Sequence, residues 1–166
     1  PWLFVNTLTA LIASTVIGLF DATIEQMVAL AVLMPIVASM GGNAGTQTMT
    51  VTVRALATKD LDIYNAARVI RREALIGLSN GLIFALVVGT VASLWFGNPN
   101  LGIVIGMALI VNLMAAAMAG ILIPLLLQKA GADPALASGV FVTMVTDVVG
   151  FLSFLGFAAW WFRLAI

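Results

Sequence analysis

The stretch ALASGVFVTMVTDVVGFLSFLGFAAWWF, residues 135–162, contains one charged side chain, Asp147, among its 28 residues. As a helix it reaches roughly 42 Å, which exceeds the ~30 Å hydrocarbon core of a bilayer. Asp147 then lies near the middle of the membrane, where a charge facing lipid costs from about 2.5 to more than 10 kcal/mol. We therefore expect its carboxylate to face protein, a partner charge or a water-filled path, and it is the first candidate functional residue.

The composition of the whole chain supports a membrane protein. Of 166 residues, 63% are apolar and 8% are charged, proportions that are typical of integral membrane proteins rather than soluble domains. The net charge of zero argues against nucleic-acid binding. Because the chain has no Cys and no His, it lacks disulfides, a thiolate nucleophile and the usual Zn and haem ligands. Oxygen atoms are the metal ligands that remain.

Charged residues divide the chain into five apolar runs long enough to cross a membrane. We expect one all-α membrane domain, residues 1–166, with five transmembrane helices at approximately 1–20, 26–53, 74–96, 101–128 and 135–162. The connections are short except for residues 54–73, where a helix capped by Asp60 or Asp62 is expected to lead into the third run. Pro134 is expected in the first turn of the last helix.

The distribution of basic residues predicts the orientation of the chain in a cell (inner or cytoplasmic) membrane. Six Lys and Arg residues lie in connections on one side of the predicted spans and Arg163 alone lies on the other. Because cytoplasmic loops carry the excess of Lys and Arg, the N-terminus is expected in the cytoplasm and the C-terminus outside it. The sequence shows no internal duplication, so a two-fold pore would need two chains.

Two of the predicted helices carry rows of polar or small residues. The residues of each row are spaced so that they share one face of a helix. If the two faces were turned toward each other, they would line a path with amide, hydroxyl, carbonyl and carboxylate oxygens. The rows are Asn43, Gln47, Thr50 and Arg54, with Thr46 beside them, in the second run, and Gly139, Thr143, Asp147 and Gly150 in the fifth.

Other polar and glycine residues in the spans are interpreted as packing features. Single amides in membrane helices hydrogen-bond across helices, and GxxxG pairs allow helices to approach closely. We apply these interpretations to Asn6, Asn80 and Asn112 and to the pairs Gly77/Gly81 and Gly102/Gly106.

Three motifs give the chain a resemblance to a known family. The motifs PIVASMGGNAGTQ at 35–47, VRALA at 53–57 and TDVVGF at 146–151 resemble the transmembrane domain of the MgtE family of magnesium transporters. The likeness extends over nearly the whole chain in span number, orientation and motif order. It implies a non-enzymatic homodimer of five-helix subunits, with a pore at the interface lined by the second and fifth helices.

The resemblance also implies which residues hold the ion. It assigns the central site to Asp147, with Thr143 one turn before it and the second helix around Gly42 and Thr46. From the two rows we add Asn43 as a further ligand and expect Gln47, Thr50, Gly139 and Gly150 to line the pore. Gly139 stands where family members carry a polar gate residue, so the gate contact is expected to differ. The family's N-terminal cytosolic sensor region is not in this sequence, which reads as an excised pore domain or a short member, and feedback closure by that route is not expected.

Magnesium suits these residues on chemical grounds as well. Mg²⁺ prefers near-octahedral oxygen ligands at about 2.0–2.1 Å, keeps several waters and is held by one or two carboxylates. One Asp147 from each of two chains would supply that pair. Mn²⁺ and other divalent ions accept the same ligands, so the preference among them stays open.

Three other functions stay open from the sequence. A proton- or sodium-coupled secondary transporter would use Asp147 as its coupling carboxylate, although no second buried ionisable partner and no inverted repeat are visible. An intramembrane aspartyl protease would need two Asp147 residues sharing one site, and no peptide-binding signature accompanies them. A purely structural membrane subunit is the third alternative.

Overall fold

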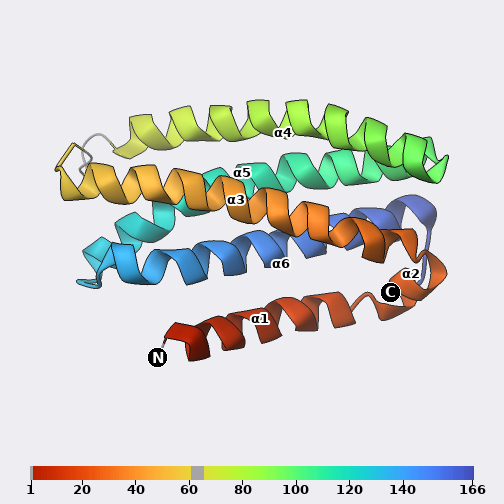
Figure 1. The fold of residues 1–166 in the computed structure, drawn as a ribbon, viewed down its shortest axis with the longest axis horizontal. Coiled ribbons are helices and arrows are strands. Elements are labelled where there is room, and N and C mark those ends of the chain that lie inside the picture. The colour runs from red at the N-terminus through yellow and green to blue at the C-terminus, as the bar shows by residue number, and fades with distance from the viewer. Residues whose placement is uncertain (1, 61–65) are drawn as a thin grey trace.

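The structure, a computed structural model, describes residues 2–60 and 66–166, and within them every regular element is a helix. The all-helical prediction is therefore confirmed for this part of the chain. Five long helices lie side by side and alternate in direction, and one short helix joins the first two (Figure 1). The elements are α1 (Trp2–Gly18), α2 (Asp21–Gln26), α3 (Ala29–Ala57), α4 (Ala66–Phe96), α5 (Pro99–Lys129) and α6 (Pro134–Phe162).

Four of these helices, α3, α4, α5 and α6, are long and apolar enough to cross a membrane. The fifth, α1, is equally apolar but has 17 residues, or roughly 26 Å of helix. It corresponds to the predicted span at 1–20 and is the shortest of the long helices. A multi-pass helical membrane protein follows from the four long helices, and the fifth span stays a prediction.

The helix boundaries follow local capping chemistry. The Asn98 side chain accepts a hydrogen bond from the backbone N–H of Asn100 at 3.1 Å, and Pro99 occupies the first turn of α5. In the same way, Asp133 accepts from the N–H of Ala135 at 2.8 Å and Pro134 begins α6, as the sequence predicts. The predicted span at 101–128 is therefore extended by two residues at its start and one at its end, and the span at 135–162 by one residue at its start.

Two connections differ from the sequence predictions. Residues expected to form a short loop at 21–25 form α2 instead, in which the Asp21 carboxylate accepts a hydrogen bond from the N–H of Ala22. The predicted third span at 74–96 begins earlier, because α4 continues from Ala66 through the Arg cluster. Asp60 follows the end of α3, and the alternative cap, Asp62, lies outside the described residues.

The helix α5 is the centre of the bundle, because it packs against α3, α4 and α6 (Figure 1), whereas α1 packs mainly on α6. Glycines bring α4 onto α5: a Cβ added at Gly81 would lie 2.9 Å from the Cα of Ile110. One added at Gly89 would lie 2.8 Å from the carbonyl oxygen of Gly102. The GxxxG pairs Gly77/Gly81 and Gly102/Gly106 therefore have the packing role that the sequence predicts.

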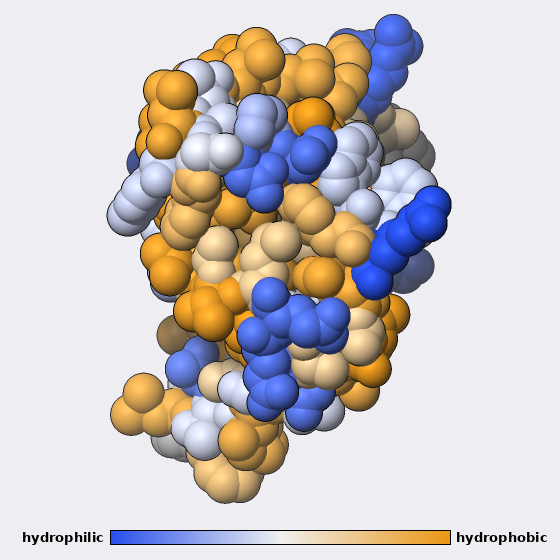
Figure 2. All heavy atoms as spheres, turned by 90° about the vertical axis from the view of Figure 1, so that its right-hand side faces the viewer, coloured by the Kyte–Doolittle hydropathy of each residue, from blue (hydrophilic) through white to orange (hydrophobic). Residues whose placement is uncertain are grey.

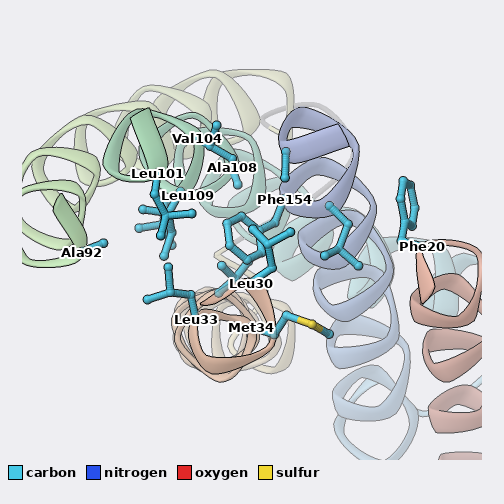
Figure 3. Close-up of a cluster of buried hydrophobic side chains, with 14 of the residues drawn as sticks. Phe20, Leu30, Leu33, Met34, Ala92, Leu101, Val104, Ala108, Leu109 and Phe154 are labelled. Carbon is cyan, nitrogen blue, oxygen red and sulfur yellow. The ribbon is translucent and has the colours of Figure 1, made fainter. Parts of the chain in front are cut away.

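Apolar side chains from three helices meet at the end of the bundle that carries α2, called here the α2 end. Figure 3 shows Leu30 and Leu33 of α3, Leu101 and Leu109 of α5 and Phe154 of α6 in one cluster, and none is more than 1% exposed. Because lipid tails are as apolar as these side chains, the cluster stabilises the bundle mainly through van der Waals packing. On the surface of the α2 end, hydrophilic residues form several separate patches among apolar side chains (Figure 2).

One polar side chain sits where α3, α5 and α6 meet. Asn112 of α5 is fully buried, and its Nδ2 donates a hydrogen bond to the carbonyl oxygen of Val37 at 2.9 Å. Glycines make room for it on both neighbours, because a Cβ at Gly41 would lie 2.8 Å from the Asn112 Cγ and one at Gly150 would lie 3.1 Å from it. The expected cross-helix role is confirmed for Asn112.

The same expectation is wrong for Asn6 and Asn80 within one subunit. Both side chains are exposed, and neither makes a side-chain hydrogen bond to another residue that the structure describes. Asn80 returns below as part of a cavity.

The two adjacent glycines of α3 give a direct test of this crossing. Replacing Gly41 with Ala should lower the free energy of unfolding by about 1–3 kcal/mol, because the new methyl group displaces the Asn112 amide. Replacing Gly42 with Ala should leave stability within about 0.5 kcal/mol of the parent, since no heavy atom lies within 4 Å of its added Cβ. Denaturant unfolding in mixed micelles measures both, and equal destabilisation by the two variants would contradict the described packing.

Candidate functional site

The helices α3 and α6 meet through small residues and leave one side of their contact uncovered. A Cβ at Gly45 of α3 would lie 2.6 Å from Cγ1 of Val142 and 3.4 Å from Cγ2 of Thr146 on α6. We call the residues through which α3 and α6 touch the contact row. On one side of this row α5 covers the pair, through Asn112 and through Gly120, whose added Cβ would lie 2.7 Å from the Cβ of Thr48. We call the side of the α3–α6 pair opposite α5 the open side.

Helical geometry places the predicted ion residues on the open side. Each residue of a right-handed helix turns about 100° from the one before it. The helices α3 and α6 run in opposite directions (Figure 1). On both helices, therefore, the residue that follows a contact residue in the sequence is rotated toward the same side of the pair. Gly42 and Thr46 each follow a contact glycine of α3, and Asp147 follows Thr146 of α6. All three therefore flank the same side of the contact.

The contacts also fix the depth of Asp147. Gly45 packs against Thr146, and Gly41 and Gly150 both pack against Asn112. Asp147 lies between those two levels, opposite residues 41–45 of α3, and it is also at the centre of α6. Asp147 is therefore central in α6, and its depth in a membrane stays a prediction.

The Asp147 carboxylate is half-buried and has no partner among the residues that the structure describes. Across residues 2–60 and 67–166, no group forms a hydrogen bond or ion pair with it. Arg54 lies about ten residues along α3 from the depth of Asp147, or roughly 15 Å, and its side chain is exposed. A carboxylate at this depth needs a cation, water or a second subunit to offset its desolvation.

Two glycines leave open space on this pair of helices: Gly42, toward the open side of α3, and Gly139, about two turns or roughly 12 Å before Asp147 on α6. No heavy atom lies within 4 Å of a Cβ added at Gly42 or at Gly139. The Thr143 hydroxyl, one turn before Asp147, is half-buried and donates to the carbonyl oxygens of Gly139 and Val140, each at 3.0 Å. Its lone pairs stay available to accept a hydrogen bond from water.

The polar row of α3 is exposed rather than turned toward α6. Asn43, Thr46 and Thr50 are all exposed, and the Thr50 hydroxyl donates to the Thr46 carbonyl at 2.8 Å. The Asn43 amide donates to the hydroxyl of Ser39 at 3.3 Å, which adds a polar residue that the sequence analysis missed. The i, i+4 spacing of Ser39 and Asn43 was the available signal. The two polar rows therefore do not face each other within one subunit.

Two predicted pore-lining residues lie elsewhere. Gly150 is buried against Asn112, because it belongs to the row through which α6 packs on α5 and α3. Gln47 lines a cavity between α3 and α4, on the opposite flank of α3 from Gly42. Helical spacing shows which residues share a face of a helix, but it does not show which neighbouring helix covers that face.

The described residues of one subunit supply a single carboxylate to this site. No three Asp or Glu residues come together in that part of the chain. One carboxylate with hydroxyl, amide and carbonyl oxygens cannot enclose a dehydrated divalent ion, but it can bind a hydrated one through its waters. Thr143, Thr46 and Asn43, together with the backbone near Gly42, are the groups within the same region.

Comparison with known proteins identifies the family. The MgtE family, described as divalent cation transporters, matches residues 34–157. Similar proteins include the magnesium transporters MgtE of Bacillus subtilis, 35% identical over 95% of this chain, and of Enterococcus faecalis, 37% identical over 98%. The magnesium transporter MgtE of Thermus thermophilus is 39% identical over 95% of this chain.

The chain spans about a third of the length of these relatives, 35% to 36% of each. The family is one of transporters, in agreement with the prediction of a membrane protein that is not an enzyme. The match over residues 34–157 and identities of 35% to 39% across nearly the whole chain establish that this chain belongs to the MgtE family.

Proposed function

We propose that this chain forms the transmembrane pore of a magnesium transporter, in which two copies carry hydrated Mg²⁺ past a pair of Asp147 carboxylates. The observation that carries the proposal is the Asp147 carboxylate itself, which lies at the centre of a membrane helix and has no partner in the described part of its own subunit. Because a lone carboxylate per chain does not balance a divalent ion, a two-fold axis beside the open side is the simplest arrangement.

The exposed polar residues of α3 support a second copy at this position. Asn43, Thr46 and Thr50 are exposed on a membrane helix, where polar groups facing lipid are unfavourable. An isologous interface would place these groups of two subunits around a shared aqueous path. Hydrated Mg²⁺ would then contact Asp147 and Thr143 through its waters, bound tightly enough to enter and loosely enough to leave.

The charges at the ends of the bundle support the proposed orientation. The end that carries the α3–α4 connection, called the α3–α4 end, also carries the start of α6 (Figure 1). Basic residues gather there, at the end of α3, the start of α4 and the end of α5, whereas Arg163 lies at the α2 end. We propose that the α3–α4 end faces the cytoplasm, that α1 crosses the membrane as a fifth span and that the C-terminus is outside.

Replacing Asp147 tests the ion site. The variants Asp147→Asn and Asp147→Ala should each reduce Mg²⁺ uptake into proteoliposomes at least about tenfold, because both remove the charge that binds the ion. Folding and dimerisation should persist, since no intrasubunit partner of Asp147 is lost among the described residues. The matched control is Asp21→Asn, an exposed carboxylate at the α2 end.

The driving force separates a channel from a coupled carrier. Uptake by the parent protein should follow the membrane potential and be unchanged when an ionophore removes the proton gradient. Dependence of uptake by the parent protein on a proton or sodium gradient would favour a coupled transporter.

For the Asp147 variants, uptake by Asp147→Ala at the parental rate would rule out the ion-binding role.

Narrowing the open side tests which helix lines the path. Replacing Gly42 with Val should reduce flux about tenfold or more with little change in stability, because the side chain would enter space that is free within the subunit. The control is Gly156→Val, where an added Cβ also meets no atom within 4 Å but lies about two turns from Gly150, toward the α2 end. Normal flux in Gly42→Val would place the path elsewhere.

Cross-linking tests the dimer. Because the chain has no Cys, Asn43→Cys introduces a single thiol on the exposed polar row. A thiol-specific cross-linker about 10 Å long should convert this variant to dimers in native membranes, since the two copies would bring the row close to the two-fold axis. Leu86→Cys, 73% exposed on α4, is the control and should stay monomeric on a denaturing gel. The reverse pattern would place the interface on α4.

A further inference from the structure

A second polar feature lies on the other flank of α3. A cavity of about 310 Å³ separates α3 from α4, which barely touch, and α5 forms its floor through Leu113 and Ala117. On α3 the cavity is lined by Ala44, the residue before Gly45, which contacts α6. Thr46, the residue after Gly45, lies toward the open side instead. The cavity is therefore separated from the candidate ion path by the thickness of α3.

Four polar side chains line this cavity without partners. Gln47 and Thr48 project from α3 and Glu73 and Asn80 from α4, and none of these side chains forms a hydrogen bond or ion pair within the described chain. Unpaired polar groups between two membrane helices are unfavourable unless a ligand or water satisfies them. Most of the remaining lining is apolar, including Val51 and Ile76. A ligand that matches this lining has a polar part and an apolar part.

The charges indicate the polar part. Two carboxylates line the cavity, Glu73, which is half-buried, and Asp60, which is exposed, and both favour a cationic group with N–H donors. Arg72 is exposed, directly precedes Glu73 and lies one turn before Ile76, so helical geometry puts it on the flank of α4 next to the cavity, where it favours an anion such as phosphate. An ammonium inside the cavity and a phosphate at its rim together describe a zwitterionic headgroup.

The spacing of the polar groups fits the rest of a phospholipid. Asn80 lies seven residues beyond Glu73 on α4, or roughly 10 Å deeper. Its amide and that of Gln47 can donate to ester carbonyls at that depth. The exposed apolar residues on the cavity side of α4, Ile76 at 39% and Ile83 at 56% exposure, and Val51 of α3 at 66% would contact the acyl chains.

We propose that the α3–α4 cavity binds a phospholipid whose headgroup carries a primary ammonium and a phosphate, with the ammonium bound to Glu73 and the acyl chains leaving between α3 and α4. This site is separate from the proposed ion site and requires no transport activity. Bound lipid would also fill the space behind α3, the helix whose opposite flank carries Gly42.

Native mass spectrometry of the purified protein with matched-chain lipids tests the proposal. Phosphatidylethanolamine should bind about fivefold more tightly than phosphatidylcholine, which has the same phosphate but no N–H donor, and more tightly than phosphatidylglycerol. Glu73→Gln should reduce phosphatidylethanolamine binding to the level of phosphatidylcholine, and Asn80→Leu should weaken both lipids. Glu25→Gln, an exposed carboxylate at the α2 end, should change neither.

Other outcomes would overturn the proposal. Equal binding of the two zwitterionic lipids, or an ethanolamine preference that survives in Glu73→Gln, would remove the role of Glu73. Preference for phosphatidylglycerol would show binding by the basic residues at the rim instead. Loss of bound Mn²⁺ in Glu73→Gln, measured by electron paramagnetic resonance with lipid binding unchanged, would make the cavity a cation site. If Glu73→Gln does not fold, the binding of the two lipids to Asn80→Leu and the lipid preference of the parent protein still test whether the cavity binds this phospholipid.

Discussion

The Asn112 side chain holds three membrane helices in register, through its hydrogen bond to the Val37 carbonyl of α3 and its packing against Gly150 of α6, and the candidate site depends on that register. In a bilayer there is little hydrophobic driving force between helices, so close packing and interhelical hydrogen bonds determine how they associate. Gly41 and Gly150 provide the space for the amide on α3 and α6. Larger residues at either glycine would separate the helices and shift Asp147 relative to α3.

This packing divides the surface of α3 into two functional flanks. Its glycine row is buried against α5 and α6, one flank carries Gly42 and Thr46 beside Asp147, and the other faces the cavity that Gln47 lines. Because α3 packs on α5 and α6 but only weakly on α4, its position is determined by α5 and α6. The proposed lipid would cover the flank of α3 that α4 leaves open.

Much of the fold follows from the sequence, because apolar run length and capping residues act locally. Pro134 and its cap define the start of α6, and the composition specifies membrane helices. Asp147 stands out because a charge is rare at that depth. The faces of the helices were harder to assign: the same periodicity that groups Gln47 with Asn43 and Gly150 with Asp147 does not show which neighbour covers each residue. That depends on contacts between distant segments, such as Asn112 with Gly150.

In the proposed dimer, a divalent ion binds between two Asp147 carboxylates on a two-fold axis. Anomalous scattering from crystals of the dimer soaked in Mn²⁺ locates such an ion directly, because Mn²⁺ accepts the same oxygen ligands as Mg²⁺. The account predicts one peak on the axis at the depth of Asp147 and Gly42, and its loss in Asp147→Asn crystals. A dimer whose Asp147 side chains face lipid or an intrasubunit cation, with the Mn²⁺ peaks elsewhere, would contradict it.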